Sequence, residues 1–394
     1  MYTPVKTVFS VLAVASLLIA CSQKVETVAP GAANATASTI VKIGHVGPTS
    51  GAIAHLGKDN ENGARLAIEE LNAAGVTIDG KKVTLELMAE DDAADPKQGT
   101  AVALKLVDAK VAGVVGHLNS GTTIPASRVY SDAGIPQISP SATHPQYTRQ
   151  GFKTTFRMVA DDARMGATLG KYTVGTLKGK AIAVIDDRTA YGQGVAEEFS
   201  KAVLAAGGKV VAKEFTTDKA TDFNAILTTI KGKRPDVVFF GGMDAVAGPI
   251  LKQMMSLGIT ARFVGGDGIC TEELMKLGGD AITDEQVVCA QAGGVEGDGR
   301  EGLDAFKARY KARFGTDIQV YSPHVYDAVR VMVGAMVKAR SADPAKYLPV
   351  LAATTGFKGV TGTISFDAKG DIRDAALTLK TVRAGKLETL AVIR

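Results

Sequence analysis

The chain has 394 residues, the length of about two domains of ordinary size. Hydrophobic residues make up 46% of it and charged residues 22%, which is typical of a folded protein and excludes a disordered chain. The net charge is only +4, without a basic run, which argues against nucleic acid or an anionic membrane surface as the main partner. The five histidines and three cysteines do not cluster, so no metal site is expected.

The first residues have the pattern of an export signal. An apolar run over residues 8–20 follows a lysine, and Cys21 comes directly after it. About thirteen apolar residues suit the hydrophobic region of a signal peptide and are too few for a membrane span of about 20. Leu18 to Cys21 resembles the lipobox of bacterial lipoproteins, whose cysteine is lipidated. We expect residues 1–20 to be removed, Cys21 to carry a lipid and 21–39 to form a flexible tether; a plain signal peptide is the alternative.

From residue 40 onward, short apolar runs alternate with longer runs of helical period. In a first series, strands are predicted over 40–46, 82–92, 111–118 and 135–139, and helices over 60–75, 95–109 and 125–133. In a second series, helices are predicted over 161–177, 192–208, 223–232 and 245–258, and strands over 181–187, 209–215, 236–243, 262–268 and 285–290.

This alternation predicts the fold class. Strands that are apolar on both faces and separated by helices favour parallel sheets covered on both sides. Two such series predict an α/β protein with two doubly wound, Rossmann-like lobes. In this architecture ligands bind beyond the carboxyl ends of the strands, and two lobes enclose a cleft. The loops after the strands are therefore the places to look for a site.

Two of these loops carry groups that suit an anion. Ser120 follows a predicted strand and opens a helix, where hydroxyls and free N–H groups favour a carboxylate; the alternative is that Ser120 is only an N-cap. After the next strand, Ser141, Ala142 and Thr143 offer a carbonyl, an N–H and a hydroxyl; the alternative is an ordinary turn.

In the second series, Asp267 lies between glycines in GGDG (265–268), where its carboxylate would neutralise an ammonium group or would be a solvated turn residue. Tyr191 either faces the cleft or packs its own loop. The Gly-x-Gly at 192–194 lacks the full dinucleotide fingerprint, and the chain has no phosphate-binding loop, nucleophile elbow or zinc-protease motif. We therefore expect no cofactor and no enzymatic activity.

The cysteines predict one covalent link. Cys270 and Cys289 are the only thiols left once Cys21 is lipidated, and an exported protein meets an oxidising compartment. We expect a disulfide between them; two buried free thiols are the alternative.

The blocks at 47–75, 90–107, 116–145, 186–194 and 366–371, taken together, resemble the periplasmic branched-chain amino-acid-binding proteins of ABC importers, the type I solute-binding family. The resemblance covers about residues 40–394. It implies a type I periplasmic binding protein whose lobes are joined by a hinge of three crossovers, near 160–162, 290–293 and 366–370. Lobe 1 would comprise 40–161 plus 291–366, and lobe 2 would comprise 162–290 plus 367–394.

The resemblance also implies a function. The protein would be a monomeric periplasmic receptor that closes over an aliphatic, branched-chain type amino acid and delivers it to an ABC permease in the inner membrane. Ser120 and Thr143 would hold the ligand's carboxylate, and the Ser141 main chain, the Thr143 hydroxyl and Asp267 would hold its ammonium. Leucine and isoleucine binders usually carry Glu where this chain has Asp267.

Several positions depart from the family pattern. Leu56 stands where an aromatic side chain often meets the ligand's tail, and Met243 replaces a tyrosine that helps the carboxylate. Ala94 and Asn119 replace the cysteines of a family disulfide, while Tyr321 keeps an aromatic wall of the pocket. These changes leave a second reading open, a receptor of the same fold for an amide, a short carboxylate or an aromatic acid.

Overall fold

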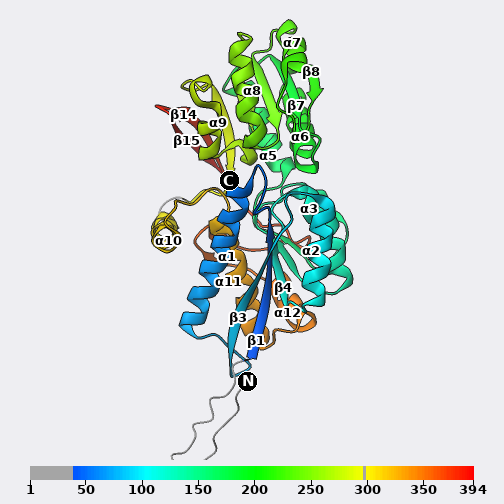
Figure 1. The fold of residues 1–394 in the computed structure, drawn as a ribbon, viewed down its shortest axis with the longest axis vertical. Helices are drawn as coiled ribbons and strands as arrows, with labels where there is room; N and C mark the ends of the chain where they lie inside the picture. Colours follow the sequence, from blue (N-terminus) through cyan, green and yellow to red (C-terminus); the bar gives the residue numbers. More distant parts are fainter. Residues whose placement is uncertain (1–38, 296–298) are drawn as a thin grey trace, which may run out of the picture. The chain divides into compact units, whose positions relative to one another are not determined.

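The computed structural model describes residues 39–295 and 299–394, and within them it has two large β-sheets and one short hairpin (Figure 1). The predicted signal peptide, Cys21 and all but the last residue of the predicted tether lie outside the described residues. No helix in the described part of the chain combines the length and the hydropathy needed to cross a membrane.

The first sheet has six strands in the order β2-β3-β1-β4-β5-β6. They are β1 (Thr39–Gly47), β2 (Thr77–Ile78), β3 (Lys81–Asp91), β4 (Gly113–Gly116), β5 (Gln137–Ser139) and β6 (Thr155–Arg157). Every neighbouring pair is parallel except β2 with β3.

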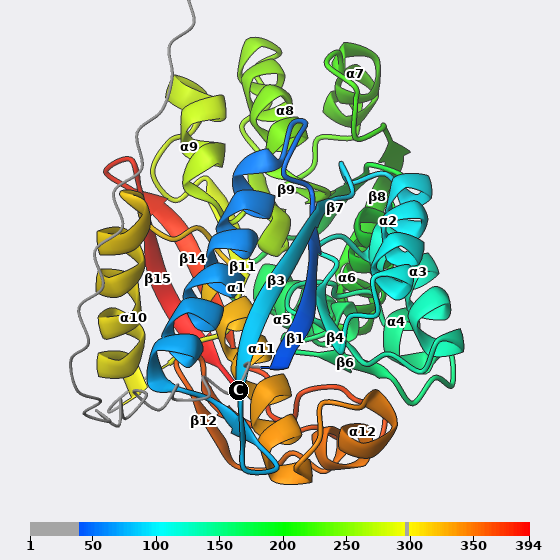
Figure 2. The same ribbon diagram turned by 60° about the horizontal axis from the view of Figure 1, so that its bottom comes forward.

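Helices cover both faces of this sheet (Figure 2). One face packs against α1 (Ala54–Ala74) and α11 (Ser322–Ala339), and the other against α2 (Pro96–Asp108) and α3 (Ser120–Asp132). The same lobe holds α4 (Gln146–Arg149), α10 (Gly299–Phe314), α12 (Pro344–Ala352) and the hairpin of β12 (Phe357–Gly359) and β13 (Gly362–Ile364). We call this sheet with these elements the first lobe.

The second sheet has seven strands in the order β15-β14-β11-β10-β9-β7-β8. They are β7 (Ala181–Asp186), β8 (Lys209–Phe215), β9 (Val237–Gly241), β10 (Arg262–Gly265), β11 (Val287–Ala292), β14 (Leu377–Arg383) and β15 (Lys386–Ile393). Its helices are α5 (Asp162–Gly175), α6 (Ala190–Ala205), α7 (Asn224–Gly232), α8 (Asp244–Ser256) and α9 (Glu272–Gly278), with 3-10 turns at Asp267–Ile269 and Gly279–Ala281. This is the second lobe.

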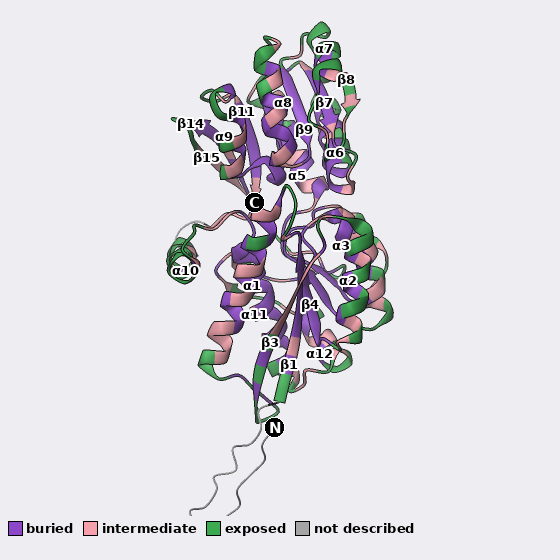
Figure 3. Ribbon diagram, viewed as in Figure 1, coloured by how far each residue is buried: buried purple, intermediate pink, exposed green. Residues whose placement is uncertain are grey.

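The cores of both lobes lie between the strands and the helices that cover them, and inner strands such as β4 and β9 are buried in Figure 3. In the second lobe α5 and α6 cover one face, and α7, α8 and α9 cover the other. The predicted α/β fold with two doubly wound lobes is confirmed. The chain passes between the lobes three times, between β6 and α5, between β11 and α10, and between β13 and β14. We call these connections the first, second and third crossovers.

The edge of the second sheet differs from the parallel pairing that the sequence predicts. β14 pairs antiparallel with both β11 and β15. Only Ala384 and Gly385 separate β14 from β15, and both have a positive φ, at 47° and 72°. A two-residue turn of this kind can only reverse the chain, so it produces an antiparallel hairpin.

Several helices begin where a short polar side chain accepts backbone N–H groups. Asp95 accepts from Lys97 and Gln98 ahead of α2, whose first residue is Pro96. Thr189 accepts from Gly192 at the start of α6 in the same way. These caps start α2 and α6 shortly after β3 and β7, and Tyr191 lies in the first turn of α6.

Candidate functional site

The predicted site residues lie just beyond the carboxyl ends of strands in both lobes. In the first lobe Ser120 opens α3 after β4, and residues 141–143 follow β5. In the second lobe Asp267 begins the 3-10 turn after β10, Tyr191 lies in the first turn of α6, and Met243 directly precedes α8. Strand β10 ends at Gly265, earlier than the predicted 268, so Asp267 belongs to the turn and not to the strand.

Asp267 is held by two tyrosines from different lobes. Its side chain is only 1% exposed. The Tyr191 hydroxyl donates to Oδ1 at 2.8 Å, and the Tyr321 hydroxyl donates to Oδ2 at 2.8 Å. Tyr321 directly precedes α11 of the first lobe, so the carboxylate joins the two lobes. Tyr191 also accepts the Gly268 N–H at 3.0 Å, which fixes its ring against the turn that carries Asp267.

Burial raises the pKa of Asp267 to about 6, and the hydrogen bonds from Tyr321 and Tyr191 offset only part of that rise. A carboxylate has about four lone-pair sites, and the tyrosines use two of them. Asp267 therefore keeps the capacity to accept N–H groups from a bound cation.

The loop after β5 is fixed by its own side chains and by the start of α3. The Ser120 hydroxyl accepts the His144 N–H at 3.2 Å, and the Ser141 hydroxyl donates to the Leu118 carbonyl at 2.9 Å. The N-cap position of α3 is Asn119, so the alternative that Ser120 is only a cap is wrong. The Thr143 hydroxyl is buried.

A second buried carboxylate, which the sequence did not single out, lies beside Thr143. Asp162 opens α5, and its N–H donates to the Thr143 carbonyl at 2.9 Å across the first crossover. Both of its carboxylate oxygens are buried. Burial raises its pKa well above the ordinary value; the Thr143 hydroxyl beside it lowers the pKa, and the charge of Asp267 raises it further. Asp162, Asp267 and Thr143 are therefore close enough to interact electrostatically.

Close packing holds Asp162 in place. A Cβ on Gly194 of α6 would lie 2.5 Å from Asp162 Oδ2 and 2.5 Å from His144 Cδ2. Only glycine leaves room there for the acid and the imidazole. Gly192 is explained by packing within the second lobe, where a Cβ would lie 2.1 Å from Asp187 Oδ1 and 2.5 Å from the Gly241 carbonyl oxygen. Neither glycine of the Gly-x-Gly therefore needs a dinucleotide to account for it.

The two departures from the family pattern, Leu56 and Met243, lie in one apolar cluster. Leu56 is fully buried there with Leu118 and Tyr321, and Met243 is partly buried against them. The Met243 sulfur also lies beside Gly268, next to Asp267. Ala94 packs at the rim of the same cluster. An apolar wall built from both lobes therefore stands next to the buried carboxylate.

Cys270 and Cys289 are joined by a disulfide, with Cα atoms 5.4 Å apart. Cys270 closes the turn that begins at Asp267, because its N–H donates to the Asp267 carbonyl at 3.0 Å. Cys289 lies in β11 and pairs with Gly265 of β10. The link therefore fastens the turn that carries Asp267 to the neighbouring strand.

Comparison with known proteins identifies the family. The family model described as "Periplasmic binding protein" matches residues 40–386. The chain belongs to the periplasmic binding protein family. A periplasmic binding protein is a substrate-binding receptor of a transporter and not an enzyme.

This binding protein has close relatives among characterised proteins. It is 38% identical over 338 residues to the "Leu/Ile/Val-binding protein homolog 1" of Brucella abortus, covering 86% of this chain and 88% of the relative. It is 37% identical over 343 residues to the "Leucine-, isoleucine-, valine-, threonine-, and alanine-binding protein" of Pseudomonas aeruginosa, covering 87% and 90%.

Solved structures agree with this assignment. The leucine-binding protein LivK of Thermotoga maritima matches with a TM-score of 0.82 at 25% identity, covering 90% of this chain and 98% of the other. The branched-chain amino-acid transporter substrate-binding protein LivJ of Streptococcus pneumoniae, in complex with isoleucine, matches with a TM-score of 0.80 at 31% identity, covering 90% and 99%.

Proposed function

We propose that this periplasmic binding protein is the receptor of an ABC importer for an aliphatic amino acid of the branched-chain type. The observation that carries the proposal is the buried Asp267, held by tyrosines of both lobes next to the apolar wall of Leu56, Met243 and Tyr321. A zwitterion with an apolar tail needs an anionic partner and an apolar surface side by side. The names of the relatives in Brucella and Pseudomonas support the same ligand class.

In this proposal the ligand's two charges are held by different lobes. Ser120 and Thr143 of the first lobe hold the carboxylate, bordered by Asn119 and Ala142. Asp267 of the second lobe and the Ser141 main chain hold the ammonium. The two ends of one small molecule then draw the lobes together, as in other proteins that close by a hinge.

Tyr191 orients Asp267 by its hydrogen bond and by its contact with Gly268. The three crossovers form the hinge, and the lobes comprise 40–161 plus 291–366 and 162–290 plus 367–394. Closure excludes water and strengthens the ionic contacts of the bound ligand.

One observation favours a second candidate, a ligand without an ammonium group. Both oxygens of Asp267 already accept tyrosine hydroxyls, and burial raises the pKa of Asp267 to about 6. A carboxyl group in this state needs no cation beside it, and in its protonated form it donates to a carboxylate or an amide. An amide, a short carboxylate or an aromatic acid would then occupy the site.

A thermal-shift panel of amino acids, amides and aromatic acids separates the two candidates. A ligand present at about 100 times its Kd stabilises the folded protein by about 2.7 kcal/mol, which is readily seen as a rise in Tm. Leucine, isoleucine and valine are expected to give the largest shifts. A shift with aromatic acids or amides and none with amino acids would establish the second candidate.

We further propose that the protein works in the periplasm, anchored to the membrane by a lipid on Cys21 after removal of residues 1–20. Residues 21–39 would tether the lobes to the anchor. A tethered monomer would deliver its ligand to an ABC permease in the inner membrane. The support is the apolar run at 8–20 that ends directly before Cys21.

A further inference from the structure

A buried arginine connects the FDAKGD segment at residues 366–371 to the proposed ligand site. Arg157, the last residue of β6, is 0% exposed. Its backbone N–H donates to the Gly370 carbonyl at 2.9 Å, and its carbonyl accepts the Ile372 N–H at 3.1 Å. A Cβ on Gly370 would lie 2.0 Å from the Thr155 carbonyl oxygen, so glycine is needed for this approach.

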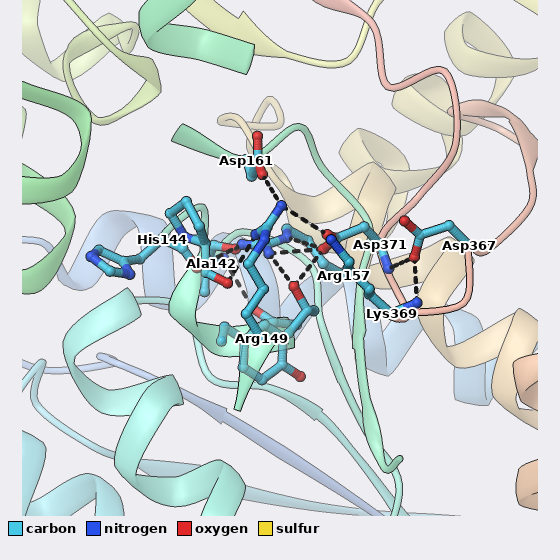
Figure 4. Close-up of polar contacts among 12 residues, drawn as sticks. Ala142, His144, Arg149, Arg157, Asp161, Asp367, Lys369 and Asp371 are labelled. Carbon is cyan, nitrogen blue, oxygen red and sulfur yellow. Dashed lines mark hydrogen bonds and ion pairs between the residues drawn. The ribbon is translucent and has the colours of Figure 1, made fainter. Parts of the chain in front are cut away.

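On one side, the guanidinium of Arg157 reaches the loop after β5, residues 141–144, which we call the ligand loop (Figure 4). Nη1 donates to the Ala142 carbonyl at 3.1 Å and to the His144 carbonyl at 2.9 Å. These two carbonyls flank Thr143. One arginine nitrogen therefore holds the backbone on both sides of a residue proposed to bind ligand.

This contact determines where the Thr143 N–H points. A trans peptide is planar, and its C=O and N–H point in opposite directions. The carbonyl of Ala142 and the N–H of Thr143 belong to the same peptide. Because Arg157 binds that carbonyl, the N–H of Thr143 is turned away from the arginine.

On its other side the guanidinium is held by Asp371. Nε and Nη2 both lie 2.8 Å from Oδ1 of this residue. Thr148 accepts Nη2 at 2.7 Å and donates to the same Oδ1 at 2.8 Å. Asp371 is fixed in turn by Asp367, which accepts the N–H groups of Lys369 and Asp371 at 2.8 and 2.9 Å.

A second arginine extends the cluster to the first crossover. Nη2 of Arg149 lies 2.8 Å from Asp161 Oδ2 and 3.6 Å from Asp371 Oδ2. Asp161 caps α5, where it accepts the Arg164 N–H at 3.0 Å. Two arginines and two aspartates thus balance in charge and join the ligand loop, the first crossover and the third crossover (Figure 4).

We propose that Arg157 and Asp371 are positioning residues for ligand binding: they orient the peptide before Thr143 and fasten the ligand loop to two of the three crossovers. This inference rests on the proposed function, because the proposed function gives the ligand loop its role in holding the ligand. Neither residue touches the ligand. Bending at the crossovers during closure would be transmitted to the ligand loop by this cluster.

The test uses two substitutions and a matched control. Asp371→Asn keeps the shape of the side chain and removes the charge that holds Arg157. Arg157→Lys keeps the charge and loses the guanidinium fork that binds Asp371 and the two carbonyls at the same time. The control pair is Arg128→Lys and Asp132→Asn, an exposed ion pair within α3 of the same lobe, with Nε 2.9 and 2.8 Å from the two carboxylate oxygens. Ligand affinity is measured by calorimetry with the best ligand of the panel, and the Thr143 amide resonance is followed by NMR in ligand-free protein.

We expect both substitutions to weaken the affinity about tenfold or more, and the double variant to be no weaker than the worse single one, because the two residues act as one unit. The Thr143 resonance shifts in both, and the control pair leaves affinity and resonance unchanged. An affinity within about twofold of wild type, or a Thr143 resonance that does not move, would overturn the inference, even if Tm falls.

The NMR measurement needs no ligand, so it still decides the inference if no compound of the panel binds. That failure would count against the proposed function alone. If Arg157→Lys does not fold, the near-isosteric Asp371→Asn carries both measurements.

Discussion

His55 of α1 and Asp244 of α8 form an ion pair between the lobes, with Nε2 and Oδ2 2.8 Å apart. Asp244 is fully buried and also accepts the Thr271 hydroxyl at 2.6 Å, while the His55 side chain is 22% exposed. Burial alone would lower the pKa of His55. The hydrogen bond and the charge of Asp244 outweigh burial and raise this pKa above its ordinary value of 6.5. The charge of Glu273 raises the pKa slightly further, and the charge of Lys276 lowers it slightly.

This pair predicts a pH-dependent closure. A histidine whose pKa is raised by closing stabilises the closed state below about pH 6.5, and the stabilisation is lost as the pH rises through the raised pKa. A half-buried pair contributes about 1 kcal/mol, which is roughly fivefold in affinity. We expect His55→Gln to bind ligand about fivefold more weakly than wild type near pH 6, and equally near pH 9. A constant ratio at both pH values in calorimetric titrations would contradict this; Arg128→Gln is the control.

The cost of losing Asp267 is expected to exceed that of any other single site residue. Asp267→Ala strands the ligand's ammonium in a dry cleft and should cost about 3–5 kcal/mol of binding free energy, two to four orders of magnitude in Kd. Ser120→Ala removes one partner among several and should cost about 1–3 kcal/mol. Asp267→Glu should be tolerated far better than Asp267→Ala. Calorimetry on folded variants checks the ranking, and an unchanged affinity in Asp267→Ala would favour the ligand without an ammonium group.

The pH dependence of the affinity of the His55→Gln variant separates the same two ligand classes. An ammonium binds the ionised form of Asp267, so amino-acid affinity should fall as the pH drops through about 6, where burial has placed the pKa of this carboxyl group. A ligand that accepts a hydrogen bond from the protonated form would instead bind more tightly there. The titrations are made in the His55→Gln background, which removes the opposing change at His55. An affinity that rises toward low pH would contradict the amino-acid proposal.

The alternating apolar runs predicted most of the fold from residue 40 to residue 290, because each run has the period of its element and is covered by its neighbours. The start of α1 was missed: the helix begins at Ala54 and not at 60. Asp59 lies in that missed turn and is polar, yet it is 2% exposed. Its carboxylate accepts the N–H groups of Gln319, Tyr321 and Ser322, and a partner so far along the chain leaves no local pattern.

No element was predicted after residue 290, and for α10 the physical reason is the exposed position of the helix. Of the sixteen residues of α10, only Phe306 and Tyr310 are buried, so a helical period is almost absent from this segment. Within the site, the loops and Asp267 could be found from strand ends and the resemblance. The hydrogen bond from the Tyr321 hydroxyl could not be found in this way, because Tyr321 was expected only as an aromatic wall and its partner Asp267 is 54 residues away. Asp162 and His55 were missed for the same reason, since their contacts are made across the lobes.

The disulfide predicts a measurable contribution to stability. A link between residues 19 apart should stabilise the folded protein by roughly 3 kcal/mol in the chain-entropy model. We expect Cys270→Ser with Cys289→Ser to lower the free energy of unfolding by about that amount, and the wild-type mature protein to show no free thiol when denatured without reductant. Two free thiols per chain would show that the bridge does not form in the exported protein. Since the link fastens the turn of Asp267, the double variant should also bind ligand more weakly.

The anchor is tested in cells. Cys21→Ser removes the acceptor of the lipid and should move the protein from the membrane fraction to the soluble periplasmic fraction. An unchanged membrane share in the Ser variant would contradict lipid anchoring. Ser22→Ala, next to the predicted acceptor, is the control and should stay in the membrane fraction.

The pairing of β14 with β11 sets the order in which the chain can be completed. The second sheet lacks its last two strands until Leu377–Ile393 has been made, and the first sheet lacks the cover of α11 until Ser322–Ala339 has been made. Neither core can be sealed by the N-terminal three quarters of the chain alone. Both lobes therefore complete their cores only late in synthesis, because the helix and the strands that cover them lie in the last quarter of the chain.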